Sequence, residues 1–343
     1  MSVSKLKEAD LLQKLPYKQI TDDGLILLLN CDLARCYEIT LPELFSLSTE
    51  QITAFHAGWV KAINGLPNHW TVVQQDWFTY KSHHEAIQPG DSALEQANKK
   101  LFNGRQYPKH RCFMYLTRHA SPKQIKILQS SFLRTRLIDK ESNSFKAIET
   151  FNNICERFGD DLMVTERMQV LPVGGDELRG KGDQRGLIEQ YLTLDTHPDH
   201  CKHIDIDATE TNDIVVGDRY MKMLAIQDMD EFASEVSPHA KFKPFSTERA
   251  DFYVSMMASV GMLLECDHIY TQYIRTMDSQ REQDRLEKVK NQMTAFAKYS
   301  RKNDLLADKI DSYLNEFING GTDRRMVTAH ANLLLWDDDK QRL

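Results

Sequence analysis

Short apolar runs of strand type alternate along this chain with segments of helical period, and this alternation limits the fold more than any other feature of the sequence. Three helices are predicted to begin at capping boxes, in residues 48–51, 92–95 and 279–282, where a serine and a Gln or Glu three residues later can satisfy each other's free backbone N–H groups. Further helices are predicted over 145–158 and 186–194. Strands are predicted over residues 24–29, 33–40, 70–80, 111–117, 162–171, 214–226, 262–274 and 325–336. The pattern predicts an α/β (α+β) fold in which helices pack on one face of a mixed sheet.

Apolar stripes on the predicted helices indicate which side of each helix should be buried. In the helix after Ser92, the side chains of Leu94, Ala97 and Leu101 share one side, which we expect to face the core. Two further stripes between residues 279 and 319 predict a long αα-hairpin whose helices pack against each other. These stripes consist of Leu286, Val289, Met293 and Phe296 in the first helix and Leu306, Ile310, Leu314 and Phe317 in the second.

The length of the chain, 343 residues, is enough for two domains of ordinary size. We predict an N-terminal α/β lobe over residues 1–200 and a second α/β lobe over 201–343 that contains the hairpin, each lobe having its own mixed sheet. The boundary is expected in the polar, His- and Asp-rich stretch 195–212. No internal repeat is visible by eye in the sequence.

Composition and charge exclude several classes of protein. A formal net charge of -7 argues against nucleic acid as a direct partner, because phosphate binding depends on clustered Lys and Arg. The longest apolar run, residues 25–29, is too short to span a bilayer, and the N-terminus lacks the apolar region of a signal peptide. Six scattered cysteines without a CxxC pair are typical of the reducing cytoplasm.

One motif suggests nucleotide chemistry. Residues 175–182, GDELRGKG, satisfy the GxxxxGK part of a phosphate-binding loop. Such a loop requires Ser or Thr after the lysine to hold magnesium, and here Gly182 follows Lys181. Asp176 and Glu177 would place carboxylates where a polyphosphate should lie. A charged turn is therefore the favoured interpretation, and a stand-alone nucleotide-binding enzyme that uses Lys181 is the alternative.

The remaining candidate sites are also weak. The apolar run that ends in Trp336, Asp337 and Asp338 is better explained as a core strand followed by a solvated turn than as a magnesium-binding strand. The cluster of His197, His200, Cys201 and His203 has no spacing typical of a closed zinc site. GxSxG, HExxH and GxGxxG motifs are absent from the sequence. We therefore expect no catalytic residue, no cofactor and no metal ion in this chain.

Several segments together give the chain a resemblance to a known family. Among them are LPELFSLS at 41–48, QDWF at 75–78, VGDR at 216–219 and STERAD at 246–251. The others are residues 23–24, 59–63, 186–191, 260–264, 268–273, 299–301, 313–316 and 329–330. In this order, from about residue 20 to the C-terminus, the chain resembles the N-terminal region of the TraG proteins of conjugative transposons in Bacteroidetes, which are relatives of the hexameric ATPases of type IV secretion systems.

The resemblance implies a function in conjugation and DNA transfer. The family carries its ATPase motifs in a C-terminal half that follows the region matched here, so no catalytic residue can be transferred to this chain, and we expect it to be the N-terminal part of a longer protein. What the resemblance implies is a docking or assembly region that links the motor to other conjugation proteins, including inner-membrane components, or to neighbouring subunits through self-association. The expected location is the cytoplasm, with a peripheral position at the inner membrane through these partners.

Overall fold

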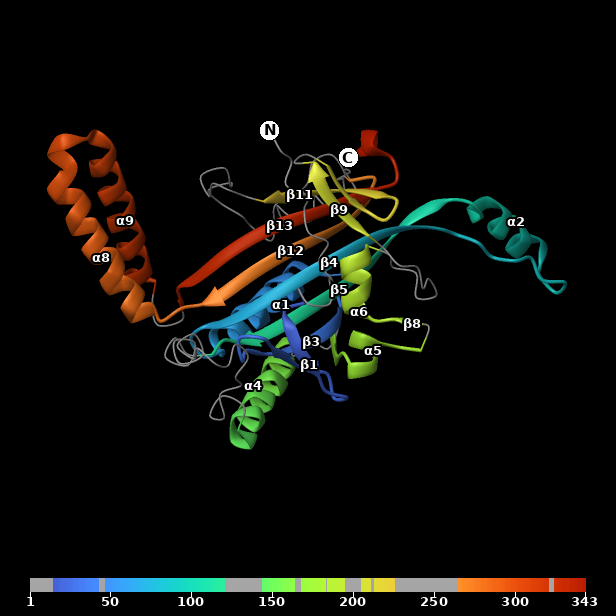
Figure 1. The fold of residues 1–343 in the computed structure, drawn as a ribbon, viewed down its shortest axis with the longest axis horizontal. Helices are drawn as coiled ribbons and strands as arrows, with labels where there is room; N and C mark the ends of the chain where they lie inside the picture. Colours follow the sequence, from blue (N-terminus) through green and yellow to red (C-terminus); the bar gives the residue numbers. More distant parts are fainter. Residues whose placement is uncertain are drawn as a thin grey trace, which may run out of the picture.

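A single antiparallel sheet of 11 strands runs through the described part of the chain (Figure 1). The structure is a computed structural model, and it describes residues 15–42, 47–120, 144–163, 168–182, 184–194, 205–210, 213–225, 264–320 and 324–343. The main path is β1-β2-β3-β5-β4-β12-β13-β11-β10-β9, and β6 pairs with β3. The strands are β1 (Tyr17–Ile20), β2 (Leu25–Leu28), β3 (Leu33–Thr40), β4 (Trp70–Ser82), β5 (Gln106–Arg118), β6 (Gln169–Pro172), β9 (Ile206–Glu210), β10 (Asp213–Val216), β11 (Arg219–Ala225), β12 (Asp267–Thr276) and β13 (Val327–Asp337).

The two halves of the chain repeat one strand topology. The first half has the order β1-β2-β3-β5-β4, and the second half has the order β9-β10-β11-β13-β12. The halves meet where β4 pairs with β12 in antiparallel register, from Thr71 opposite Arg275 to Phe78 opposite His268. The described sheet thus consists of two similarly wound units joined edge to edge, a repeat that the sequence does not display.

Helices cover both faces of the first half of the sheet. On one face, α1 (Thr49–Asn64) and α4 (Phe145–Met163) pack over a core that includes Trp70, Leu116 and Phe151. On the other face, α5 (Gly175–Arg179) and α6 (Leu187–Thr193) help to bury Phe113 and Trp77. Because successive residues of a strand point to opposite faces, the apolar runs of β4 and β5 can supply both cores.

Two helical insertions project from opposite ends of the sheet (Figure 1). Strands β4 and β5 pair over their full length, from Trp70 opposite Arg118 to Ser82 opposite Gln106, whereas β12 accompanies β4 only as far as Phe78. The rest of the β4–β5 ribbon extends beyond the sheet and carries α2 (Ala93–Phe102). At the other end, β12 and β13 are connected through α8 (Ser279–Phe296), the short 3-10 turn η4 (Ala297–Tyr299) and α9 (Arg301–Asn319).

The α+β class is confirmed, but three details of the expected arrangement are wrong. The described strand pairs are all antiparallel, one sheet crosses both halves in place of a separate mixed sheet in each, and helices lie on both faces. Strands that follow one another in the chain, such as β1, β2 and β3, pair as antiparallel neighbours, and the non-consecutive neighbours β3 and β5, β11 and β13, and β4 and β12 are antiparallel as well. Most of the stretch 195–212 lies outside the described residues, and the division into 1–200 and 201–343 stays a prediction.

Several element boundaries also differ from the sequence-based expectations. Of the strand expected over 162–171, residues 162 and 163 are the end of α4, where Leu162 belongs to the buried side of the helix, and residues 169–171 belong to β6. Residues 164–167 lie outside the described part of the chain. The capping boxes at Ser48 and Ser92 are confirmed. The third helix begins one residue earlier than expected, since the side chain of Asp278 accepts the hydrogen bond from the backbone N–H of Arg281.

The helical hairpin is confirmed, and it is only partly buried. Helices α8 and α9 lie against each other, and Leu314 is buried while Leu286 is half-buried. Phe296 and Leu306, which were expected in the seam, are exposed. Two helices have too little shared surface to cover two complete apolar stripes, so part of the apolar surface remains open to solvent.

Replacing Leu314 by Ala should destabilise the hairpin by about 2–5 kcal/mol, because it leaves a cavity in the seam. Leu306→Ala is the matched control, and it should cost less than about 1 kcal/mol because Leu306 is 42% exposed. Amide hydrogen exchange of the α8 and α9 backbones measures both effects locally. Equal effects of the two changes would contradict the described packing.

Candidate functional site

The loop at residues 175–182 does not have the geometry of a phosphate-binding loop. Its first part is the helix α5, and its Gly–Lys pair forms the strand β7 (Gly180–Lys181), which pairs with β8 (Gln184–Arg185). A phosphate-binding loop instead places its lysine at the beginning of a helix, where backbone N–H groups converge on the anion. Here the Nζ atom of Lys181 lies 2.7 Å from Oδ2 of Asp176, and this contact lowers the pKa of Asp176 and raises that of Lys181.

The hollow beside this loop has mixed charge. It has a volume of about 320 Å³, and Arg111, Asp176, Glu177 and Lys181 are among its lining residues. Arg111 is held by Glu38, with 2.7 Å between Nε and Oε1, and lies 3.5 Å from Glu177. Cations that are already paired with carboxylates gain little from a polyphosphate, so the arrangement does not favour the nucleotide-binding alternative.

Isothermal titration calorimetry with ATP and magnesium should therefore give no binding heat for the isolated chain. Lys181→Ala should leave the titration unchanged, since the wild-type lysine already has an anionic partner in Asp176. Micromolar affinity that disappears in the Lys181→Ala variant would establish the alternative instead.

The structure bears on the other candidate sites to different extents. The cluster of His197, His200, Cys201 and His203 lies outside the described residues. Trp336 is buried in β13. The next two residues form ion pairs, Asp337 with Arg342 at 3.6 Å and Asp338 with Arg219 at 3.5 Å. Among the described residues, no group of three or more His, Cys, Asp and Glu side chains is placed to hold a metal ion.

The structure also assembles a polar triad that the sequence did not reveal. Nδ1 of His119 lies 2.8 Å from Oδ2 of Asp32, and Nε2 of the same ring lies 2.7 Å from Oγ1 of Thr71. This order of acid, imidazole and hydroxyl resembles that of a hydrolase triad. However, the second carboxylate oxygen of Asp32 accepts a hydrogen bond from the backbone N–H of Ala120 at 2.7 Å. The triad thus connects the β2–β3 turn to the end of β5, and we interpret it as a structural joint.

A second polar row crosses the middle of the sheet. Oδ1 of Asp76 lies 2.8 Å from Nε2 of His110, and Oδ2 of Asp76 accepts a hydrogen bond of 2.8 Å from Gln74. The ring of Phe78 stacks between His110 and the fully buried His268, with centroid distances of 4.6 and 4.7 Å. These contacts link β5, β4 and β12, so they stabilise the strand pairing that unites the two halves.

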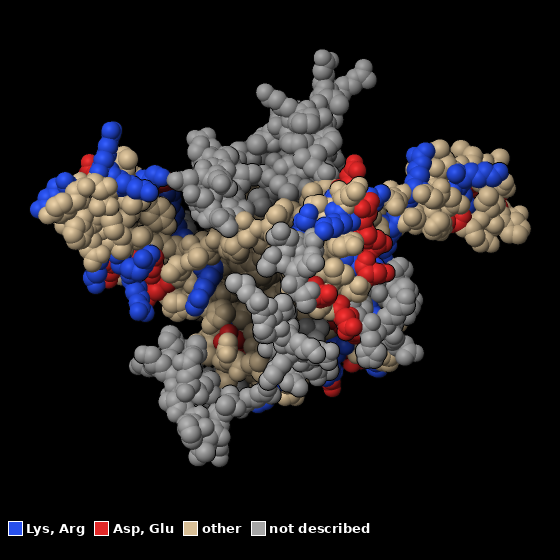
Figure 2. All heavy atoms as spheres, turned by 45° about the horizontal axis from the view of Figure 1, so that its top comes forward, with Lys and Arg blue, Asp and Glu red and all other residues tan. Residues whose placement is uncertain are grey.

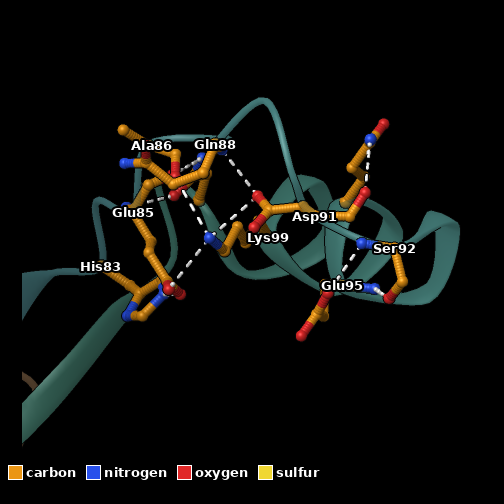
Figure 3. A network of polar contacts seen from close by, with 10 residues as sticks. His83, Glu85, Ala86, Gln88, Asp91, Ser92, Glu95 and Lys99 are labelled. Carbon is orange, nitrogen blue, oxygen red and sulfur yellow. Dashed lines mark hydrogen bonds and ion pairs between the residues drawn. The ribbon is translucent and has the colours of Figure 1, made fainter.

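The most distinctive surface belongs to the segment 83–105 at the tip of the β4–β5 ribbon, which we call the α2 head. Its polar groups lie between the helix and the preceding loop (Figure 3). Lys99 reaches Asp91 at 3.0 Å and Glu85 at 3.3 Å, and it also donates to the carbonyl of Ala86. The side chain of Asn103 bonds to the backbone of Glu85 in both directions. A polar network of this kind holds the helix to its loop without an apolar core.

The expected orientation of this helix is wrong. Leu94 and Leu101, which were expected to face the core, are 72% and 53% exposed, and Ala97 is exposed as well. Helix α2 has no buried residue. An amphipathic pattern defines two sides of a helix but does not state which side is covered, and here the polar side faces inward.

Electrostatics in the α2 head favour the charged forms of its side chains. The backbone N–H of Gln88 and then Lys99 lower the pKa of Asp91, and the backbone N–H of Ser92 lowers the pKa of Glu95. The hydrogen bond from Lys99 to Asp91 raises the pKa of Lys99. Beside this network lies a hollow of about 720 Å³ whose lining includes Phe102 and Tyr107.

The α8–α9 hairpin at the opposite end of the sheet also has exposed apolar side chains. Tyr299 is 73% exposed and Ile318 is 62% exposed, and neither belongs to a core cluster of the sheet. At the base of the hairpin, a groove of about 400 Å³ is lined by Val60 and Ile63 of α1 and by Phe317 of α9, among others. Figure 2 shows many Lys and Arg side chains over the hairpin. The two projecting insertions are thus the candidate interaction surfaces.

Comparison with known families gives one short match. A family model described as a domain of unknown function, B. Theta Gene description (DUF3875), matches residues 4–57. The described part of that match contains β1, β2, β3 and the beginning of α1. No curated protein matches the chain. Among the helices of the described residues, none combines the length and the hydropathy needed to cross a bilayer.

Acid should loosen the α2 head before it affects the sheet. A carboxylate whose folded-state pKa is lowered contributes stability at pH values above its ordinary pKa, here 3.8 for Asp91 and 4.5 for Glu95, and the contribution is lost as the pH falls below these values. Backbone amide protection in α2, measured by NMR, should therefore fall between neutral pH and about pH 3 while protection in β4 persists. Asp91→Asn should remove much of this dependence, and protection that stays constant in the wild-type chain would contradict it.

Proposed function

We propose that this chain is the non-catalytic N-terminal docking or assembly region of a TraG-type conjugation ATPase. In this proposal the chain links the motor of a type IV secretion apparatus to other conjugation proteins, including inner-membrane components, or to neighbouring subunits. It acts from the cytoplasm and reaches the membrane as a peripheral component.

The observation that carries the proposal is the α8–α9 hairpin, which stands away from the sheet with apolar side chains exposed. Tyr299, Leu305 and Ile318 are all more than half exposed. Apolar groups on a projecting helix pair add nothing to the core of the fold, whereas a partner that covers them gains hydrophobic energy. The resemblance of the sequence to the TraG proteins supplies the kind of partner.

The alternative, a stand-alone nucleotide-binding enzyme, has less support. Its essential lysine, Lys181, is paired with Asp176 and lies on a strand. No observation on the described residues favours it over docking.

Docking should be visible as direct capture of detergent-solubilised inner-membrane conjugation proteins by the purified chain, without nucleotide. The double change Tyr299→Ser and Ile318→Ser should weaken capture at least about tenfold, because both side chains would leave the buried part of the interface. Detergent removes the bilayer, so that only protein contacts are measured. The matched control is Leu94→Ser with Leu101→Ser, on the other insertion, and it should bind normally. If the wild-type chain captures none of these proteins, the docking proposal is wrong.

A further inference from the structure

Helix α2 of the α2 head is amphipathic, and side chains of its polar side form hydrogen bonds within the head. Gln96, Lys99 and Asn103 recur at three- and four-residue steps, and all three side chains bond to the loop that precedes the helix. The opposite side contains Leu94, Ala97 and Leu101, which nothing in the described structure covers. Because these hydrogen bonds hold the polar side of α2 against the loop, the apolar side faces solvent and is available for binding.

We propose that the α2 head binds directly to the surface of an anionic lipid bilayer, with the apolar side of α2 inserted between the headgroups. This goes beyond the proposed function, since docking through proteins requires no lipid contact. A helix that lies in the membrane interface needs one apolar side and nearby cations, and it need not span the bilayer.

The head exposes further apolar side chains besides those of the apolar side of α2. Phe102 and Tyr107 are 48% and 44% exposed, and Ile87 in the preceding loop is 43% exposed. Aromatic side chains with a polar end, such as Tyr107, are favoured at the level of the headgroups. Together with the two leucines, these side chains offer bulky groups at one tip of the molecule.

Charge distinguishes a lipid surface from a neutral apolar groove as the occupant. The ribbon and head from residue 79 to 109 contain five Lys and Arg and three Asp and Glu, a net charge of +2 in a chain whose total is -7. The three carboxylates of the head are already engaged, Glu85 and Asp91 with Lys99 and Glu95 with the backbone of Ser92. Lys100 lies beside Leu101, and the guanidinium of Arg105 lies over the ring of Phe102, 5.5 Å from its centroid.

These cations remain available to lipid phosphates. Within the described part of the chain, Lys81, Lys100, Arg105 and Lys109 take part in no ion pair. Each Lys or Arg near an anionic membrane surface adds attraction that weakens with salt. The combination of exposed leucines with unpaired cations is what an acidic bilayer recognises.

The position of the head allows this contact. The β4–β5 ribbon extends beyond the point where the pairing of β4 with β12 stops, and α2 lies at its far end (Figure 1). The base of the ribbon is fixed, because the backbone N–H of Tyr80 donates to Asp267 at 2.7 Å and the Tyr80 hydroxyl donates to the carbonyl of Leu264. A bilayer can therefore approach the tip while the body of the protein stays in water.

The experiment is co-sedimentation of the purified chain with protein-free vesicles. Binding is expected with mixed phosphatidylglycerol and phosphatidylcholine vesicles, should weaken as salt is added, and should be much weaker with phosphatidylcholine alone. Leu94→Ser with Leu101→Ser should weaken binding at least about tenfold, since both side chains lose their burial in the bilayer. Neither residue is buried in the free protein, and circular dichroism should confirm that the variant is folded.

Two controls distinguish binding through the α2 head from nonspecific adsorption and from an effect of the net charge of the chain. Leu305→Ser on α9 replaces a leucine that is 55% exposed, and it should bind vesicles like the wild type. Lys100→Glu with Arg105→Glu should abolish the preference for anionic vesicles, whereas Lys288→Glu with Arg301→Glu, which changes the net charge equally on the hairpin, should retain it.

The proposal is overturned if the wild-type chain binds neither kind of vesicle, in which case the apolar side of α2 is left to a protein groove. It is also overturned if the head variants and the hairpin variants bind equally. Because the vesicles contain no protein, failure here leaves the docking proposal intact. Failure of capture in detergent would in turn leave vesicle binding unaffected.

Discussion

The antiparallel pairing of β4 with β12 is the constraint on which the rest of the structure depends. Both strands belong to hairpins, β4 with β5 and β12 with β13, so antiparallel pairing places the tips of these hairpins at opposite ends of the sheet. Each tip carries a helical insertion, and neither insertion can therefore contact the other within one chain. The junction is reinforced by Thr276, whose hydroxyl donates to the carbonyl of Pro67 at 2.7 Å and accepts from the backbone N–H of Trp70.

Local chemistry could be predicted from the sequence, whereas long-range arrangement could not. The capping boxes at Ser48 and Ser92 were found because a cap depends on residues three positions apart. The triad of Asp32, Thr71 and His119 unites three distant parts of the chain, and no local pattern indicates it. The side of α2 that faces inward was predicted wrongly for the same reason, because burial depends on what the rest of the chain places nearby.

Two lobes were expected from the length of the chain, whereas in the described residues one sheet joins the two halves because their edge strands pair. Each half contains five strands in the same order, which in isolation would leave β4 or β12 as an exposed edge. Pairing these two edges removes both and buries Ile269 beside Trp77. Arg325, which precedes β13, also connects the two halves. Its guanidinium donates to the carbonyls of Asn64 and Leu66 at the end of α1, where a helix has free acceptors. Burial lowers the pKa of Arg325, yet these carbonyls compensate its charged form with hydrogen bonds.

The two insertions differ in how they are held together, and this difference separates their proposed functions. The α8–α9 hairpin is held by an apolar seam around Leu314, so its outer apolar groups are a continuation of the same kind of surface and suit a protein partner that extends the seam. The α2 head is held by ion pairs and hydrogen bonds around Lys99, so its apolar side has no structural function in the free protein. Changing Leu94 or Leu101 therefore removes a binding surface while the network that folds the head remains. A surface that can change without cost to the fold is open to selection for what it binds, and the cations beside it are the reason that an anionic lipid surface is proposed.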